Sequence, residues 1–195
     1  KICEILKPIE YTKVDGIIDI VFATSTDQQF SRELDTKPEE ILTENLTKKE
    51  EYARKRASIS SSLSQQIENM PDLIKRKTAL FSDASDDYKI AIPISKNYER
   101  KDQNYWYAYS ESMRNFLERA KVSFMVFGML DKNFAFAIPY KVFEDYKNKM
   151  NTTPAKNNKS EYWHVSFREE NNQINLILPK SGELISMEEF KFEIR

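Results

Sequence analysis

The fold is decided by residues 104–138, which read NYWYAYSESMRNFLERAKVSFMVFGMLDKNFAFAI. Residues 104–109 alternate aromatic side chains between two faces, which is typical of a strand. Residues 112–121 follow with a helical spacing, and one face of that helix would carry Met113, Phe116, Leu117 and Ala120. A strand that leads directly into a short amphipathic helix indicates a mixed α and β architecture.

Further apolar runs on both sides of that helix predict more strands. Residues 122–130 and 134–138 are strand-like and are joined by a polar turn at residues 131–133. Upstream, residues 88–94 form another run that is rich in β-branched side chains. These runs are short and closely spaced, so we expect them to pair mostly in antiparallel fashion.

The C-terminal part continues this pattern. Residues 139–150 predict a second helix, and residues 162–167 and 174–178 predict a hairpin that turns at residues 169–172. Residues 186–195 would close the domain. We therefore predict an α+β fold in which a helical N-terminal part is followed by a mostly antiparallel sheet with two flanking helices.

The N-terminal part has a different composition. Residues 35–82 are rich in helix formers, and we expect a helix that breaks near residues 60–62 and another over residues 64–81, interrupted by Pro71. For residues 17–23 a strand and a short buried helix fit equally well. The predicted division is a mainly helical part, 1–82, and an α+β domain, 88–195, packed together as one unit.

Composition excludes several classes of site. The 195 residues include 30 basic and 31 acidic side chains, so the net charge is -1 and no overall field favours nucleic acid or a membrane. The three glycines are too far apart for a phosphate-binding loop of the Walker or GxGxxG type. One histidine and one cysteine cannot form a zinc finger or a disulfide framework.

The chain has no run of 18 apolar residues, so we expect neither a membrane span nor a signal peptide. The prediction is a cytoplasmic protein with no membrane partner. Because the first residue is Lys1 rather than Met, we also expect a piece of a longer chain, which leaves association with other subunits or domains open.

Residues 89–109 combine basic and aromatic side chains. Cations neutralise phosphates and aromatic faces stack on bases, so this combination favours nucleic acid. The alternative is a solvated hairpin tip with alternate aromatics in the core. His164 would share a strand face with Tyr162 and Ser166, where it would contact a base or a phosphate or would be an ordinary half-exposed strand histidine.

A second basic segment lies in the N-terminal part, where basic residues outnumber acidic ones eight to four over residues 45–80. Residues 63–77 have the spacing of a helix-turn-helix, with Lys75, Arg76 and Lys77 on a second helix that would enter a major groove. The alternative is a solvated face of an amphipathic helix pair.

A third pattern is typical of Mg²⁺-dependent nucleases. Glu99 and Lys101 form a Glu-x-Lys, and Asp86 or Asp87 precedes them across an apolar strand. Two carboxylates would hold Mg²⁺ and the lysine would lie beside the attacked phosphate. The same pattern arises by chance in a chain with 31% charged residues.

The aromatic series from Tyr105 to Tyr109, the run Phe124-Met125-Val126-Phe127-Gly128 and the segment Tyr162-Trp163-His164-Val165 together resemble a domain of bacterial restriction and defence proteins. The resemblance covers residues 88–195. It implies a DNA-associated function, by recognition or by cleavage, and names no catalytic residue.

These patterns together predict a DNA-binding domain of a bacterial restriction or defence system, which holds phosphates with Lys and Arg and contacts bases with aromatic rings. The residues predicted to contact nucleic acid are Lys75, Arg76, Lys77, Lys96, Arg100, Lys101, Trp106, Tyr107, Trp163 and His164. Binding needs no cofactor. The alternatives are a Mg²⁺-dependent endonuclease using Asp87, Glu99 and Lys101, the one case that requires Mg²⁺, and a protein-interaction module with an aromatic sheet face.

Overall fold

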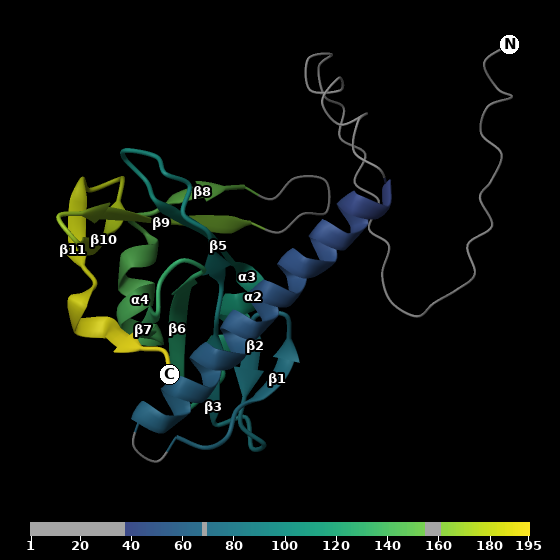
Figure 1. Ribbon diagram of the computed structural model, residues 1–195. Helices are drawn as coiled ribbons and strands as arrows, with labels where there is room; N and C mark the ends of the chain where they lie inside the picture. Colours follow the sequence, from purple (N-terminus) through teal and green to yellow (C-terminus); the bar gives the residue numbers. More distant parts are fainter. Residues whose placement is uncertain (1–37, 68–69, 155–160) are drawn as a thin grey trace, which may run out of the picture. The chain divides into compact units, whose positions relative to one another are not determined.

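The computed structural model describes residues 38–67, 70–154 and 161–195, with the backbone alone for residues 38–46. The chain divides into two compact units, residues 1–42 and 43–195, and the second unit is described below. It contains a long helix, two sheets and two short helices (Figure 1). The segment 17–23 lies outside the described residues.

The large sheet has the strand order β1-β2-β3-β6-β7-β12, and β4 pairs with the end of β6 beyond β3. β3 and β4 run parallel to β6, and the other pairs are antiparallel. The strands are β1 (Ile74–Lys77), β2 (Leu80–Ser82), β3 (Tyr88–Ala91), β4 (Ile94–Ser95), β6 (Val122–Met129), β7 (Phe134–Pro139) and β12 (Lys191–Glu193).

The small sheet has the order β11-β10-β9-β5, with β8 also paired to β9, and all its pairs are antiparallel. Its strands are β5 (Tyr105–Ser110), β8 (Asn151–Thr153), β9 (Tyr162–Glu170), β10 (Gln173–Leu178) and β11 (Glu183–Ser186). The expected hairpin is confirmed as β9 and β10. Asn171 and Asn172 form its turn with φ of 52° and 63°, a left-handed conformation that asparagine tolerates well.

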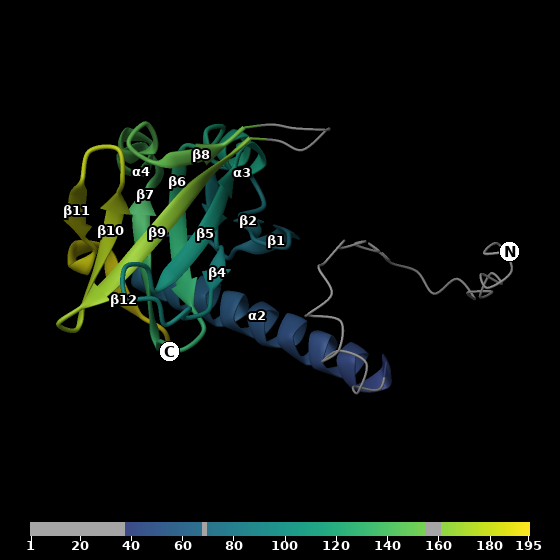
Figure 2. The ribbon, with the colours of Figure 1, turned by 90° about the horizontal axis from the view of Figure 1, so that it is seen from above.

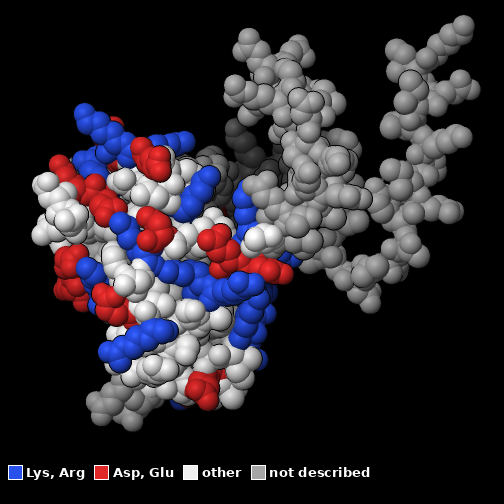
Figure 3. Space-filling view, viewed as in Figure 1, with Lys and Arg blue, Asp and Glu red and all other residues white. Residues whose placement is uncertain are grey.

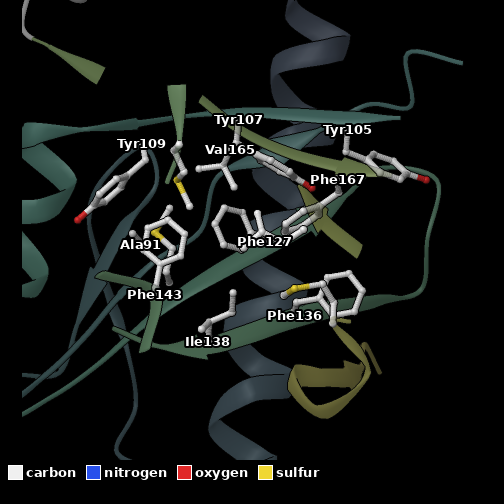
Figure 4. Packing of buried hydrophobic residues seen from close by; sticks show 14 of the residues in the cluster. Ala91, Tyr105, Tyr107, Tyr109, Phe127, Phe136, Ile138, Phe143, Val165 and Phe167 are labelled. Carbon is white, nitrogen blue, oxygen red and sulfur yellow. The ribbon is translucent and has the colours of Figure 1, made fainter. Parts of the chain in front are cut away.

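The main core lies between the two sheets. In Figure 2 the strands of the small sheet cross over those of the large one. Tyr105, Tyr107 and Tyr109 point inward from β5 because alternate residues of a strand share a face. They meet buried rings and methyl groups of β6, β7, β9 and α4 (Tyr140–Lys147), including Phe127, Phe136, Phe143, Val165 and Phe167 (Figure 4).

The other face of the large sheet is covered by α2 (Pro38–Gln66). Ile59 and Leu63 of α2 pack with Phe81, Ile90 and Val126 in a second, smaller core. Gly128 allows this close approach, because a Cβ there would lie 2.5 Å from Cδ1 of Ile59. The unit therefore has three layers, which are the small sheet, the large sheet and α2.

Two short helices flank the sheets, as the sequence predicts. α3 (Glu111–Leu117) begins at Ser110, whose side chain accepts a hydrogen bond from the backbone N–H of Met113, and it packs against β3 and β5. α4 packs against β6 and β7. A 3₁₀ turn, η1 (Glu188–Phe190), leads into β12. The α+β class and the mostly antiparallel pairing are thus confirmed, although the strands form two sheets rather than one.

Two predictions for the N-terminal part are wrong. α2 runs through residues 60–62 without a break, because Ile59 and Leu63 on either side of them pack in the core against the large sheet. The expected helix over residues 64–81 is instead the β1–β2 hairpin. Leu80, Phe81 and Ser82 are buried and pair with β3, and this tertiary pairing outweighs the local helical spacing.

With that hairpin the expected helix-turn-helix is also wrong. Lys75, Arg76 and Lys77 belong to β1, the exposed edge strand of the large sheet. Residues 83–87 make the turn between β2 and β3. Within the described residues, no helix is long and apolar enough to cross a membrane.

Candidate nucleic-acid interface

The outer face of the small sheet carries the residues of β5 and β9 that alternate with the core. Trp106 lies opposite Ser166, and His164 lies between Ala108 of β5 and Asn151 of β8. These outward side chains are half-buried rather than covered. The expectation that His164, Tyr162 and Ser166 share a face agrees with the burial pattern of β9, in which Val165 and Phe167 are buried.

Hydrogen bonds fix the aromatic rings on this face. The indole N–H of Trp106 donates to Nδ1 of His164 at 3.2 Å, and Nε2 of His164 lies 2.7 Å from the hydroxyl of Thr153. Because Nδ1 accepts, the network assigns the neutral tautomer with the proton on Nε2, which donates to Thr153. The ring of Tyr162 stacks on His164 at a centroid distance of 5.2 Å and meets Trp106 edge to face at 6.4 Å.

The loop between β4 and β5 adds cations beside these rings. Tyr98 is 40% exposed, and both Nζ of Lys96 and the guanidinium of Arg100 lie over its ring, at 5.2 and 5.7 Å from the centroid. The cation–π contacts hold two positive charges around one ring. Glu99, with φ of 53°, turns the chain between them, and its N–H donates to the side chain of Asn97.

The loop is anchored to both sheets. The N–H of Tyr98 donates to the carbonyl of Asn104, and the N–H of Trp106 donates to the hydroxyl of Ser95 at the end of β4. Asn104 in turn accepts through its side chain from the N–H of Glu169 in β9. Tyr98 and its two cations are therefore held at a defined place above the outer face of the small sheet.

Loop and sheet together enclose a shallow hollow of 320 Å³, which is lined by Tyr98, Arg100, Gln103, Trp106 and His164. No carboxylate lines it. Among the described residues, Lys96, Arg100 and Lys101 form no ion pair, so their charges are available to a ligand. The hollow combines aromatic rings, one amide and the guanidinium of Arg100, which forms no ion pair with the described residues. We call this hollow, with Lys96, the sheet-face site.

Two aromatic residues predicted to contact bases lie elsewhere. Tyr107 is 2% exposed, and its hydroxyl donates to the carbonyl of Gly128 in the core. Trp163 faces the opposite side of β9, where it packs on Tyr109 and under the ammonium of Lys147. Alternation along the strands places both side chains away from Trp106 and His164, so neither can stack on a base bound at the sheet-face site.

The three predicted cations of β1 are also separate from the sheet-face site, since β1 is the far edge of the large sheet. Arg76 turns back toward the next turn of the chain, where Nε donates to the hydroxyl of Ser82 at 2.7 Å and a terminal nitrogen donates to the carbonyl of Asp83. The carboxylate of Asp86 pairs with the same guanidinium, with Oδ1 at 3.7 Å from a terminal nitrogen of Arg76. Lys75 and Lys77 remain exposed.

The residues of the nuclease pattern are not brought together. Asp87 stands at the start of β3 and pairs with Lys121 at 2.7 Å, whereas Glu99 and Lys101 lie in the loop beyond β4. β3 pairs with the first residues of β6 and β4 with its last residues. The eight residues of β6, about 23 Å of strand, therefore separate Asp87 from the loop that carries Glu99 and Lys101. Within the described residues there is no group of three metal-binding side chains.

Sequence reasoning did not select Tyr98, Gln103, Thr153 or Tyr162 as contact residues. Tyr162 could have been found, because it lies two residues before His164 on the same strand. Thr153 and Gln103 reach the sheet-face site through β8 and through a loop, and the sequence carries no signal for either approach. Comparison with known proteins finds no matching family model, no similar curated protein and no similar solved structure.

Proposed function

We propose that residues 43–195 form a DNA-binding domain that uses the sheet-face site. The observation that carries the proposal is the hollow in which Trp106, His164 and Tyr98 lie beside Lys96 and Arg100, two cations without an ion-pair partner among the described residues. Aromatic faces take bases and neighbouring cations take the phosphates between them. A small anion would need the cations but not three rings.

The rings are suited to this role because they are held before a ligand arrives. Trp106 is fixed by its hydrogen bond to His164, and Tyr98 by the two cations above it. A ligand then loses little of its binding energy in ordering the protein. Gln103 adds an amide, which both donates and accepts hydrogen bonds, at the edge of the same hollow.

The resemblance of residues 88–195 to a domain of restriction and defence proteins is the reason for proposing DNA as the nucleic acid and a bacterial restriction or defence system as the setting. The endonuclease alternative gains no support from the positions of Asp87, Glu99 and Lys101. Binding through this surface needs no metal ion.

The test is a titration of the protein with fluorescent single-stranded and duplex DNA at two salt concentrations. Trp106→Ala is expected to weaken binding by about 1–3 kcal/mol, the usual contribution of one base–aromatic stack. Trp163→Phe is the control, because Trp163 lies in the neighbouring strand β9 and faces the other side of the same sheet. Thermal melts of both variants check that they fold.

The proposal is supported if affinity falls steeply as salt is raised and if Trp106→Ala weakens binding more than Trp163→Phe does. Equal binding by the two variants, or no binding of either form of DNA at low salt, overturns it. The second result would favour the protein-interaction alternative, in which the same aromatic face docks on a partner subunit.

A further inference from the structure

The free edge of the large sheet is β1, whose residues Ile74–Lys77 are all exposed. β1 pairs with β2 on one side, and on its other side the backbone N–H and C=O groups form no hydrogen bond with the described residues. Such a row of donors and acceptors is a template on which an extended segment of another chain can add as a further strand. The edge of β1 is therefore open to strand addition.

A groove of 510 Å³ lies beside this edge, between α2 and the β1–β2 hairpin. It is lined by Lys75 of β1 and by Phe81 of β2, which lie opposite each other in the register of the two strands. Phe81 packs with Ile59 and Leu63 of α2, so Lys75 lies on the face of the sheet that α2 covers. Alternate side chains of an added strand would lie on the same face, above the groove.

The wall that α2 gives to the groove is built from small side chains, namely Ala53, Ala57, Ser60, Ser61 and Ser64. Small side chains on this wall leave room for those of a second chain. The helix rises by about 16 Å from the first to the last of them. An extended chain covers that distance with about five residues. Edge and groove together therefore fit a short extended peptide.

The charges of the edge and the groove favour an acidic peptide. Lys75 and Arg56 line the groove against one carboxylate, that of Asp72, and β1 has no acidic residue. Lys75 and Lys77 form no ion pair with the described residues. In Figure 3 a band of Lys and Arg side chains crosses the middle of α2 toward the side on which β1 lies. Opposite charges on neighbouring strands stabilise their pairing.

The same charges disfavour a second copy of this chain. Two β1 strands side by side would bring three cations against three cations, and like charges weaken a strand pair. Lysines on an edge strand discourage pairing with most other chains as well. An acidic strand is the exception, because its carboxylates turn the repulsion into attraction.

A peptide also fits this edge better than a nucleic acid does. The edge presents carbonyl oxygens as well as N–H groups, and a peptide strand donates to the former and accepts from the latter. Phosphate oxygens only accept, so the carbonyl groups would repel them. Ile74, which is 49% exposed, adds an apolar contact on the face of the sheet opposite to Lys75.

We propose that β1 docks an acidic, extended segment of a partner protein, which adds to the large sheet as a further strand. Alternate carboxylates of that segment lie above the groove and pair with Lys75 and with Arg56, whose terminal nitrogens form no hydrogen bond with the described part of the chain. This docking edge is separate from the sheet-face site, so the proposal does not depend on DNA binding.

The test titrates the 195-residue chain with labelled peptides of about six residues, in which glutamate or lysine alternates with valine. We expect the glutamate peptide to bind at least about 10-fold more tightly than the lysine peptide, and Lys75→Glu to reverse this preference. A glutamate peptide methylated on its backbone nitrogens keeps its charge but loses its donors, and it should not bind. Amide hydrogen exchange at residues 74–77 should slow when the unmethylated peptide binds.

Lys77→Glu is the matched control. It makes the same charge change in the same strand, but Lys77 does not line the groove and lies opposite Leu80, which belongs to the core on the other face of the sheet. Equal losses in the two variants would show a general charge effect and overturn the proposal. Equal affinity of the wild type for the glutamate and lysine peptides, or undiminished binding of the methylated peptide, would also overturn it.

Two further measurements assign the edge to another occupant if the proposal is wrong. Displacement of the glutamate peptide by an oligothymidylate would show that phosphates take its place. A dimer of the chain that the glutamate peptide dissociates, measured by light scattering, would show that β1 pairs with a second copy. Either result would overturn the proposal.

Discussion

Two short basic segments, residues 75–77 and 96–101, each carry three Lys or Arg side chains, and the structure treats their charges differently. In β1, Arg76 is held by Ser82, Asp83 and Asp86. In the loop before β5, Lys96 and Arg100 lie on the ring of Tyr98 and meet no carboxylate of the described residues. The first arrangement stabilises the fold, and the second leaves its charge available to a ligand.

The difference shows that a cluster of basic residues does not by itself indicate a binding surface. What matters is whether acceptors of the protein itself already take up the donors. An arginine with several internal acceptors gains little from a phosphate, because it must first give those contacts up. An aromatic ring orients a cation without satisfying its hydrogen-bond donors.

The largest expected effect comes from exchanging the two arginines in turn for glutamine. Arg100→Gln should reduce DNA affinity by about 10-fold through loss of a charged contact, with an unchanged melting temperature. Arg76→Gln should leave DNA affinity unchanged and lower the free energy of unfolding by about 1 kcal/mol, because the hydroxyl of Ser82 and the carbonyl of Asp83 lose a donor. DNA titration and urea unfolding of both variants measure this. A fall in affinity in both would erase the distinction.

Acid should weaken the β1 segment more than the loop. The hydrogen bond from the hydroxyl of Ser82 is the largest cause that lowers the Asp86 pKa below its usual 3.8, and the charges of Lys89 and Arg76 lower it further. A carboxyl whose pKa is lower in the folded state stabilises the fold above its unfolded pKa and loses that effect as the pH falls through the folded pKa. The stability of the wild type should therefore decline below about pH 4.

Asp86→Asn should lower stability at neutral pH and flatten this decline. Thermal melts between about pH 2 and pH 6 compare the two proteins. Parallel curves would show that Asp86 plays no part in the decline. Asp83, whose pKa is lowered chiefly by the hydroxyl of Ser85, is the second carboxyl to examine in the same turn.

A smaller effect is expected from Tyr98. Tyr98→Phe keeps a ring under the two cations and should leave DNA affinity nearly unchanged, whereas Tyr98→Ala removes it and should weaken binding by about 0.5–1 kcal/mol, the usual strength of an exposed cation–π contact, or more where a base also stacks. Fluorescence titration of both variants gives the values. Equal loss in both would mean that the hydroxyl, rather than the ring, is what the ligand needs.

The smallest effect is expected from Lys101→Ala. Lys101 is exposed and makes no ring contact with the described residues, so its contribution is a screened, long-range attraction. We expect a change of less than about threefold at moderate salt, and a larger one at low salt. A loss equal to that of Arg100→Gln would show that the loop acts through its net charge and not through its geometry.

The sequence predicted which residues share a face of a strand better than it predicted which of these faces is open to a ligand. Alternation in 104–109 and 162–167 correctly grouped Trp106 apart from Tyr107, and His164 apart from Trp163. For residues 104–109 it does not tell which group is buried, because that depends on where the other sheet lies. Tyr107 and Trp163, both predicted contact residues, lie on the faces turned away from Trp106 and His164.

The β1–β2 segment could not be predicted from local spacing. Ile67, Met70 and Ile74 repeat at the three- and four-residue intervals that a helix shows, and the decisive contact is the pairing of Leu80–Ser82 with β3. Such pairing depends on residues of β3, which lie outside the segment whose spacing is read. The position of Tyr98 beside the small sheet depends in the same way on two accepted hydrogen bonds, since the Asn104 carbonyl accepts from the N–H of Tyr98 and the Ser95 hydroxyl accepts from the N–H of Trp106.

The loop that carries Tyr98 leaves the large sheet at β4 and enters the small sheet at β5. It is the passage of the chain from one layer to the other, so it keeps its shape when both layers are folded. A ligand bound there has affinity for the fully folded state and little for a state in which either layer has opened. Binding should therefore delay unfolding of both layers together, by mass action. Amide hydrogen exchange would then slow in strands such as β7 and β10, which never touch the ligand.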